Sequence, residues 1–225
     1  MATFAKGIIP TVHIVDDDAS FRTGIGRLLK AAGYAVRTYS SGTEFMRLQE
    51  ATGPGCVLLD MFMPDGTGLD VQRTLTTRTH RLPIIFVTGQ GTIPDTVCAM
   101  QAGAVDFLTK PVEKAALLQA VALALANDQE ARSRLETVHD TEGRYGTLSP
   151  RQRAVFRGVV EGKLNKQIAA ELDIAERTIK AHRAEVMRKM RATSVAELVH
   201  YSLHLLDKES DQKGKRPRTR RFASS

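Results

Sequence analysis

Apolar runs of strand length alternate with helix-like segments five times in the first 126 residues. The runs are continuous, which is typical of strands that are buried on both faces of a parallel sheet. Between them apolar side chains recur at helical spacing, as at Phe21, Ile25, Leu28 and Leu29. The pattern predicts a five-stranded parallel sheet covered by helices, a (βα)5 arrangement. The strands are expected at residues 11–15, 35–39, 56–60, 84–87 and 105–109.

The helices between these strands can be placed from residue types that begin or end a helix. Pro94 suits the first turn of a helix over residues 95–102, because a proline loses no hydrogen bond in that position. Helices at residues 42–50 and 68–79 are expected on opposite sides of the strand that ends at Asp60.

Beyond residue 126 the sequence favours helices throughout. The polar continuation of the last helix, residues 127–142, predicts a linker helix. Ser149-Pro150 with Gln152 is typical of a capped helix start. A turn over residues 173–175 separates two later helices, which predicts a helix-turn-helix within an all-α, four-helix domain. The helices are expected after Ser149 and at residues 165–172, 176–190 and 195–206.

These patterns divide the chain into four parts. We expect an α/β domain at residues 1–126, a helical linker at 127–146 and the four-helix domain at 147–207. Residues 208–225 form a basic tail, which we expect to be disordered because runs of like charge repel each other.

The net charge of +7 is concentrated in the last third of the chain. Residues 1–127 carry 11 basic and 11 acidic side chains, whereas residues 147–206 carry 11 and 6 and residues 207–225 carry 7 and 3. A local basic excess is typical of nucleic-acid binding, although a membrane surface would attract it too.

The sequence gives no sign of membrane insertion or secretion. No apolar run approaches the roughly 20 residues that span a bilayer, and residues 1–10 contain no apolar signal-peptide core. Cys56 and Cys98 lack metal-ligand spacing, and we expect both to be buried thiols without a disulfide in a reducing cytoplasm.

Polar side chains follow four of the predicted strands. Asp16 and Asp17 follow the first, Asp60 the third, Thr88 the fourth and Lys110 the fifth. Because ligands of open α/β sheets bind at the carboxyl ends of the strands, these side chains are expected at one site. Pro64 and Gly66 favour a turn directly after Asp60.

A cluster of carboxylates needs a cation. Two carboxylates about 4 Å apart repel by roughly 4 kcal/mol at an effective dielectric constant of about 20. Oxygen ligands favour a hard ion, Mg²⁺ or Mn²⁺, that shares its shell with phosphate oxygens. A carboxylate nucleophile beside such an ion, a lysine and a hydroxyl is typical of phosphoryl transfer. The predicted product is an aspartyl phosphate on Asp60.

The residues so far resemble the receiver domain of two-component response regulators. The match covers residues 12–112 with every anchor in order, and it resembles the FixJ type of the NarL/LuxR class. The segments Val-His-Ile-Val-Asp-Asp and Gly-Ala-Val-Asp-Phe-Leu-Thr-Lys-Pro carry the likeness. The resemblance implies a flavodoxin-like fold and a cis peptide bond between Lys110 and Pro111.

The same resemblance implies a role for each site residue. Asp60 would be the phosphoacceptor, and the metal would bind Asp16, Asp17, Asp60 and the backbone carbonyl of Phe62. The residues that engage the phosphoryl group or switch with it would be Thr88, Lys110 and Phe107.

The second half resembles a LuxR-type DNA-binding domain over residues 148–206. Leu-Asn-Lys-Gln-Ile-Ala-x-x-Leu-x-Ile starts at Leu164, and Arg-Thr-Ile-Lys-Ala-His starts at Arg177. Ala175 departs from the family, which usually has a serine cap there. We expect base readers at Lys180, Ala181, Arg183 and Ala184, and phosphate contacts at Asn165, Lys166, Thr178 and Lys189.

The sequence therefore predicts a cytoplasmic response regulator that is not an enzyme. Its expected partners are a sensor histidine kinase, double-stranded DNA and, on phosphorylation, a second copy of itself, with RNA polymerase as a further candidate and no membrane. A haloacid-dehalogenase-type phosphohydrolase would need a second acid where Phe62 stands. A receiver acting only through protein contacts would leave the basic helix-turn-helix unexplained.

Overall fold

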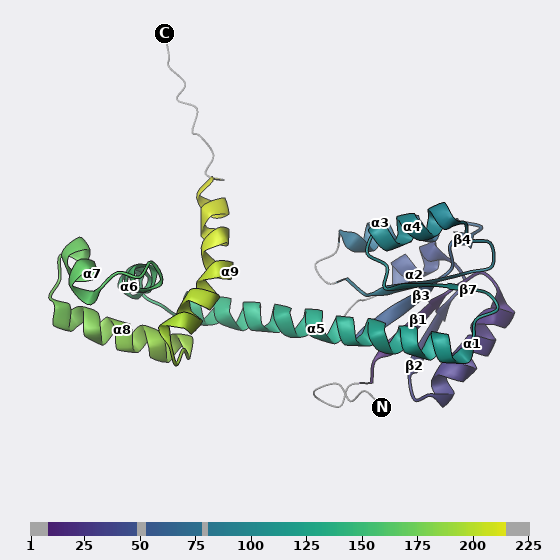
Figure 1. Ribbon diagram of the computed structural model, residues 1–225, viewed down its shortest axis with the longest axis horizontal. Helices are drawn as coiled ribbons and strands as arrows, with labels where there is room; N and C mark the ends of the chain where they lie inside the picture. The colour runs from purple at the N-terminus through teal and green to yellow at the C-terminus, as the bar shows by residue number, and fades with distance from the viewer. Residues whose placement is uncertain (1–8, 49–52, 78–80, 215–225) are drawn as a thin grey trace, which may run out of the picture. The chain divides into compact units, whose positions relative to one another are not determined.

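The computed structural model describes residues 9–48, 53–77 and 81–214 of the chain. Within them, the first half contains a five-stranded sheet in the order β2-β1-β3-β6-β7 (Figure 1). Every pair of neighbouring strands in it is parallel. The five-stranded parallel sheet predicted from the apolar runs is confirmed. Its strands are β1 Thr11–Val15, β2 Ala35–Tyr39, β3 Gly55–Leu59, β6 Ile84–Thr88 and β7 Asp106–Thr109.

Helices cover both faces of this sheet, and each face has its own apolar core. One core joins the sheet to α1 and α5 through side chains such as Leu29 and Leu117. The other joins it to α2, α3 and α4 through side chains such as Phe45 and Val71. The helices are α1 Ala19–Ala31, α2 Gly42–Leu48, α3 Gly68–Thr76, α4 Ile93–Gln101 and α5 Lys114–Gly146 (Figure 1).

The prediction that the helices near residues 42–50 and 68–79 lie on opposite sides of the Asp60 strand is wrong. Both α2 and α3 pack on the same face. The connections from β2 to β3 and from β3 to β6 run in the same direction across the sheet. Because parallel crossovers are right-handed, connections that run in the same direction place their helices on the same face.

Smaller differences concern α4 and the turn after Asp60. α4 begins at Ile93 with Pro94 in its first turn, two residues before the predicted start. Cys98 is exposed, contrary to prediction, because α4 touches the core mainly through Ala99, whereas Cys56 is buried as expected. The turn contains a short hairpin of β4 Phe62–Met63 and β5 Gly66–Thr67 that the sequence pattern did not indicate.

The second half of the chain is helical throughout its described part. Its helices are α6 Pro150–Val160, α7 Asn165–Leu172, α8 Glu176–Met190 and α9 Val195–Gly214. Ser149 caps α6 by accepting a hydrogen bond from the Gln152 backbone N–H, 3.2 Å away. A shared core includes Phe156, Ile168 and Val186. The four predicted helices are confirmed, although α9 extends into the segment expected to be disordered from residue 208.

Contacts divide the chain into two compact units, Met1–Ser133 and Arg134–Ser225, and the division falls inside α5. The residues predicted to form a linker thus continue the last helix of the first unit without a break. In the described segments of the chain, no helix is both long and apolar enough to cross a bilayer.

His13 on β1 is a buried histidine of the sheet. The residue is 9% exposed, and its Nδ1 and the Tyr39 hydroxyl share a hydrogen bond of 3.0 Å. Burial, aided by the positive charge of Arg37, lowers the pKa of His13 to about 4. The imidazole is therefore neutral in the folded protein near neutral pH.

We predict that the first unit loses stability as the pH falls from about 6.5 towards 4. The unfolded chain takes up a proton on His13 near pH 6.5, whereas the folded chain resists it until about pH 4. The loss should be on the order of 3 kcal/mol of unfolding free energy. Denaturant unfolding at both pH values, monitored on sheet residues, measures it, and His13→Gln serves as the variant that lacks the titration. An equal pH dependence in that variant would contradict the assignment.

Candidate phosphorylation site and DNA-binding surface

Asp60 stands directly after β3, at the carboxyl edge of the sheet. Its backbone N–H donates to the carbonyl of Val15 at the end of β1, 2.8 Å away, so the ends of the two strands are held in register. The Asp60 side chain is almost buried, with 7% of the residue exposed. Gly68 packs against it so closely that a Cβ would lie 2.4 Å from the carbonyl oxygen of Asp60.

Asp16 and Asp17 follow β1 and lie beside Asp60. Carboxylate oxygens of the three residues all lie within 4.8 Å of one another. Asp16 is buried and Asp17 is exposed, and burial raises the pKa of Asp16 against the opposing effect of Lys110. Asp18 instead caps α1 by accepting hydrogen bonds from two backbone N–H groups of its first turn.

Lys110 follows β7, the strand at the edge of the sheet, and its side chain reaches two of the three carboxylates. The peptide bond between Lys110 and Pro111 is cis, as the resemblance implied. The Lys110 ammonium donates to Asp16 at 2.7 Å and to Asp60 at 2.9 Å. Burial acts to lower the pKa of Lys110, but the hydrogen bonds from its ammonium to the two carboxylates outweigh burial and raise it. The ammonium thus neutralises part of the repulsion between two buried carboxylates.

Thr88 and Phe107 lie together at the ends of β6 and β7. Thr88 is buried, and its Oγ1 accepts a hydrogen bond of 3.3 Å from the backbone N–H of Gln90. A Cβ on Gly91 would stand 2.6 Å from both the Phe107 ring and the Thr88 methyl group. The loop after β6 can therefore approach both side chains only because residue 91 is glycine.

Three clustered carboxylates suit a hard divalent cation. Asp16, Asp17 and Asp60 supply oxygen atoms within a few ångströms of one another, and the carbonyl of Phe62 comes from the hairpin that begins two residues after Asp60. No nitrogen or sulfur ligand is in this cluster, which favours magnesium or manganese over zinc. The residues present fit the predicted ion.

Sequence reasoning missed two residues at this site. Arg22 donates from its guanidinium to the backbone carbonyl of Asp16 at 2.5 Å. The Phe21 ring lies under the Lys110 ammonium, 4.3 Å from it. Phe21 was assigned to the core-facing stripe of α1, because an aromatic residue at helical spacing gives no sign of a neighbouring cation.

The second candidate surface is on α8. Ile179, Val186 and Met190 are buried, whereas Lys180, Ala181 and Ala184 are exposed. Short side chains on this face leave room for another surface to approach the helix. The turn before α8 contains Asp173 in the left-handed region (φ 52°), followed by Ala175, which provides no side-chain cap.

The other predicted DNA-contacting residues are placed differently. Lys166 is exposed, and Asn165 is half-buried at the start of α7, where its Oδ1 accepts a hydrogen bond of 3.1 Å from Arg183. Lys189 donates to the Thr147 carbonyl and to Gln152 Oε1, both at 3.0 Å, so it holds α8 to the start of α6. Thr178 is half-buried in the first turn of α8.

Comparison with known proteins gives the family. Residues 12–122 match the response regulator receiver domain, and residues 146–202 match the bacterial regulatory proteins of the luxR family. The chain is a response regulator of this family. The receiver-plus-LuxR identification made from the sequence is confirmed, and the family is one of transcription regulators rather than enzymes.

Several response regulators resemble the chain over most of its length. It is 41% identical to the response regulator protein TodT of Pseudomonas putida over 87% of this chain and 86% of that protein. It is 39% identical to the transcriptional regulatory protein FixJ of Rhizobium meliloti over 86% and 95%, respectively. The solved structure of the response regulator StyR is 42% identical, covers 87% of this chain and 98% of its own, and superposes with a TM-score of 0.77.

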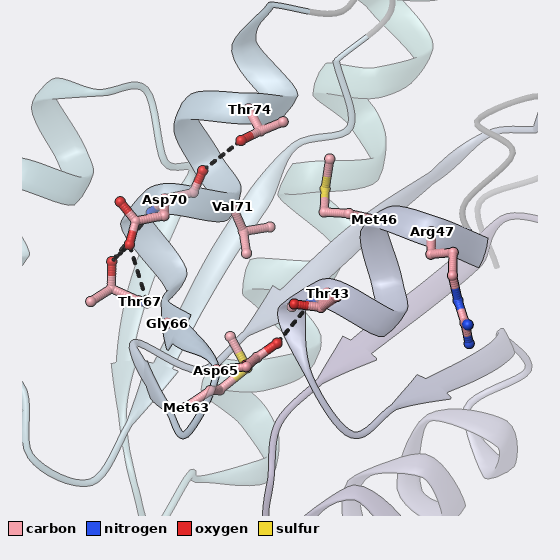
Figure 2. A pocket seen from close by; sticks show the side chains of 11 residues that line it. Thr43, Met46, Arg47, Met63, Asp65, Gly66, Thr67, Asp70, Val71 and Thr74 are labelled. Carbon is pink, nitrogen blue, oxygen red and sulfur yellow. Dashed lines mark hydrogen bonds between the residues drawn. The ribbon is translucent and has the colours of Figure 1, made fainter.

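The receiver domain also has a pocket away from the acidic cluster. It lies between α2, the β4–β5 hairpin and α3, with a volume of about 510 Å³ (Figure 2). Met46, Met63 and Val71 line it with apolar surface, while Asp70 accepts from the Thr67 hydroxyl at 2.6 Å. None of the predicted phosphorylation-site residues lines this pocket.

We predict that Ala175→Ser stabilises the LuxR-type domain. The backbone at Ala175 is extended (φ −64°, ψ 142°), so a serine hydroxyl there could accept a hydrogen bond from the first turn of α8. A serine cap in place of alanine should raise the unfolding free energy by about 1 kcal/mol. Thermal unfolding measures the change, and Ala175→Val, which also enlarges the side chain but offers no acceptor, is the matched control. Equal stability of the serine and valine variants would refute the missing cap.

Proposed function

We propose that this response regulator is switched by phosphorylation of Asp60. A sensor histidine kinase supplies the phosphoryl group, the modified receiver promotes dimerisation, and the LuxR-type domain binds promoter DNA to regulate transcription. The observation that carries the proposal is the carboxylate of Asp60 held at 2.9 Å from the Lys110 ammonium, with Asp16 and Asp17 beside it. A nucleophile, a cation and an acidic metal site thus stand at one sheet edge.

Each residue of the site has a distinct part in this proposal. A carboxylate oxygen of Asp60 attacks phosphorus as the bond from phosphorus to the donor's histidine nitrogen breaks and the imidazole leaves. Lys110 turns from the carboxylates to a phosphoryl oxygen. Asp16, Asp17, Asp60 and the Phe62 carbonyl would hold Mg²⁺, which neutralises charge on the phosphoryl group when bound. The Thr88 hydroxyl donates to another phosphoryl oxygen.

Phosphorylation reaches the outer surface through Thr88 and Phe107. If Thr88 moves towards the phosphoryl group, it vacates space beside the Phe107 ring, because both side chains lie 2.6 Å from where a Cβ on Gly91 would stand. Such a packing change at the ends of β6 and β7 alters the surface of α4. That surface exposes Ile93, Val97 and Met100, which suits a dimer contact.

In the LuxR-type domain the exposed face of α8 is proposed to enter the major groove. Lys180, Ala181, Arg183 and Ala184 would face base edges, where a lysine or arginine recognises guanine and a small side chain accommodates a thymine methyl group. Asn165, Lys166, Thr178 and Lys189 would contact phosphates, with Lys189 first releasing its contacts to α6. A dimer would then place two such helices on repeated half-sites.

The remaining proposals concern partners and organisation. We propose residues 1–126 as the receiver, 127–146 as the linker, 147–207 as the DNA-binding domain and 208–225 as a basic tail, of which 215–225 lie outside the described residues. RNA polymerase is a candidate partner of the DNA-bound dimer. Response regulators of this type are typically cytoplasmic, and we propose that location here.

We predict that Asp60→Asn abolishes phosphorylation by acetyl phosphate with Mg²⁺. Asparagine keeps the size of the side chain but removes the nucleophilic oxygen. Asp65→Asn is the matched control, because Asp65 lies near by but accepts its hydrogen bond from the backbone of Thr43 in α2. Intact-protein mass spectrometry should find the added phosphoryl group in the control alone. Wild-type phosphorylation of the Asp60→Asn protein would disprove the assignment.

We predict opposite signatures for two exposed lysines of the DNA-binding domain. Lys180→Ala should lose about 1–3 kcal/mol of binding free energy on specific DNA and little on random DNA, because a base contact is lost. Lys166→Ala should weaken binding to both DNAs and reduce the salt-dependence slope by about 0.9, because one phosphate contact is lost. Titrations at several salt concentrations test both. Indistinguishable behaviour of the two variants would show that their roles are wrongly divided.

We predict that a phosphoryl mimic promotes dimerisation through α4. A change in the ratio of dimer to monomer from 1:99 to 99:1 would need roughly 5.5 kcal/mol of differential stability. One repacked aromatic side chain supplies less than that, so some dimer should form without phosphate. Sedimentation with and without beryllofluoride measures the shift. Val97→Arg should suppress it, whereas Leu123→Arg on α5, which packs on the opposite face of the sheet, should not. A wild-type protein that stays monomeric with beryllofluoride would break the link.

A further inference from the structure

The Phe21 side chain forms one wall of the phosphorylation site. The Lys110 Nζ stands 4.3 Å from the centroid of the Phe21 ring. The same ammonium donates to Asp16 and Asp60 at 2.7 and 2.9 Å, and the Lys110 side chain is 19% exposed. Two carboxylates and one aromatic face therefore surround the cation.

The ring is fixed by the start of α1. Asp18 accepts hydrogen bonds from the backbone N–H groups of Ser20 at 2.8 Å and Phe21 at 3.2 Å, which sets the first helical turn. Phe21 itself is half-buried against the core that joins α1 to the sheet. Its position is therefore tied to both the helix cap and the core, and it does not depend on the cation.

Transfer of a phosphoryl group requires Lys110 to change partners. With acetyl phosphate, a carboxylate oxygen of Asp60 forms a bond to phosphorus as the bond from phosphorus to the acetate oxygen breaks. Acetate leaves with the bonding electron pair, and no proton moves because nucleophile and leaving group are both carboxylates. The ammonium must then follow the charge from the Asp60 carboxylate to the phosphoryl oxygens.

An aromatic face attracts an ammonium without competing for its hydrogen bonds in the way that a carboxylate does. While its ammonium contacts the ring, Lys110 can exchange one hydrogen-bonded oxygen for another and still remain beside Asp60. A leucine in the same place would fill the space, but it would offer the cation no negative face.

We propose that Phe21 is a positioning residue for phosphoryl transfer, holding the Lys110 ammonium beside Asp60 while it exchanges carboxylate for phosphoryl oxygens. This inference rests on the proposed function, in which Asp60 accepts the phosphoryl group. It assigns to α1 a part in the chemistry beyond packing against the sheet.

The test compares Phe21→Leu, which removes the aromatic face, with Phe21→Tyr, which retains it. Phosphorylation by acetyl phosphate with Mg²⁺ is followed by intact-protein mass spectrometry on the full chain over a range of donor concentrations. Phe21→Leu should lower the maximal rate by roughly three- to tenfold, with little change in the donor concentration at half-maximal rate. Phe21→Tyr should restore the rate to near the wild-type value.

Leu28→Ala is the matched packing control. Leu28 is half-buried against the same core, about two turns further along α1 than Phe21. It should lower the melting temperature while leaving the phosphorylation rate unchanged. Phe21→Leu should lower the rate, and it should lower the melting temperature less than Leu28→Ala does.

Three results would overturn the inference while leaving the proposed function intact. These are wild-type kinetics in Phe21→Leu, an equally slow Phe21→Tyr, or an equal loss of rate in Leu28→Ala. Absence of phosphorylation in the wild-type protein would instead refute the proposed function itself. The two failures are therefore distinguishable in one set of measurements.

Discussion

The Lys110 ammonium between Asp16 and Asp60 is the interaction on which the rest of the site depends. The two carboxylates are buried at neighbouring strand ends, and burial raises the pKa of Asp16. Lys110 comes from the loop after β7, and β6 lies between that strand and β3. Its long side chain bridges this distance and offsets the negative charge. The cluster thus holds one ammonium against three carboxylates and keeps a net negative charge before any phosphoryl group or metal ion arrives.

In the proposed function, this arrangement of charges links the site to the protein surface. A phosphoryl group would add negative charge beside Asp60, and the side chains that surround it would have to rearrange. Lys110 is held by hydrogen bonds and by the Phe21 ring, and Thr88 packs beside Phe107 under the loop that contains Gly91. Because the interior is closely packed, a displaced Thr88 requires a new arrangement of Phe107. In the proposed switch, a change of charge at one edge of the sheet would thereby become a change of shape near α4.

The LuxR-type domain is built on a different principle. Its core is apolar, and its polar contacts fix helices to one another: Arg183 joins α8 to α7, and Lys189 joins α8 to the start of α6. The exposed strip of Lys180, Ala181 and Ala184 lies opposite the buried side chains of α8. One side of α8 packs against the core, so its other side stays exposed, where the proposed DNA contacts lie.

The sequence by itself determined the main elements, the family and the strand ends at which the candidate site lies. Continuous apolar runs ending in Asp60, Thr88 and Lys110 predicted a parallel sheet with its chemistry at one edge, because buried strands need apolar residues and the strand ends share an edge. Ser149 predicted a helix start, since an unpaired N–H at a helix end needs a local acceptor. Such signals depend on residues that are close together in the sequence, so they can be read from the sequence alone.

Only the tertiary structure decided which distant residues meet. The strand order and the right-handed crossovers put α2 and α3 on one face, and periodicity carries no information about either. The exposure of Cys98 followed from how little of α4 touches the core. Phe21 resembled an ordinary core residue until the fold brought Lys110 to within 4.3 Å of its ring. Contacts between residues far apart in the chain depend on topology, and the sequence pattern records only which faces are apolar.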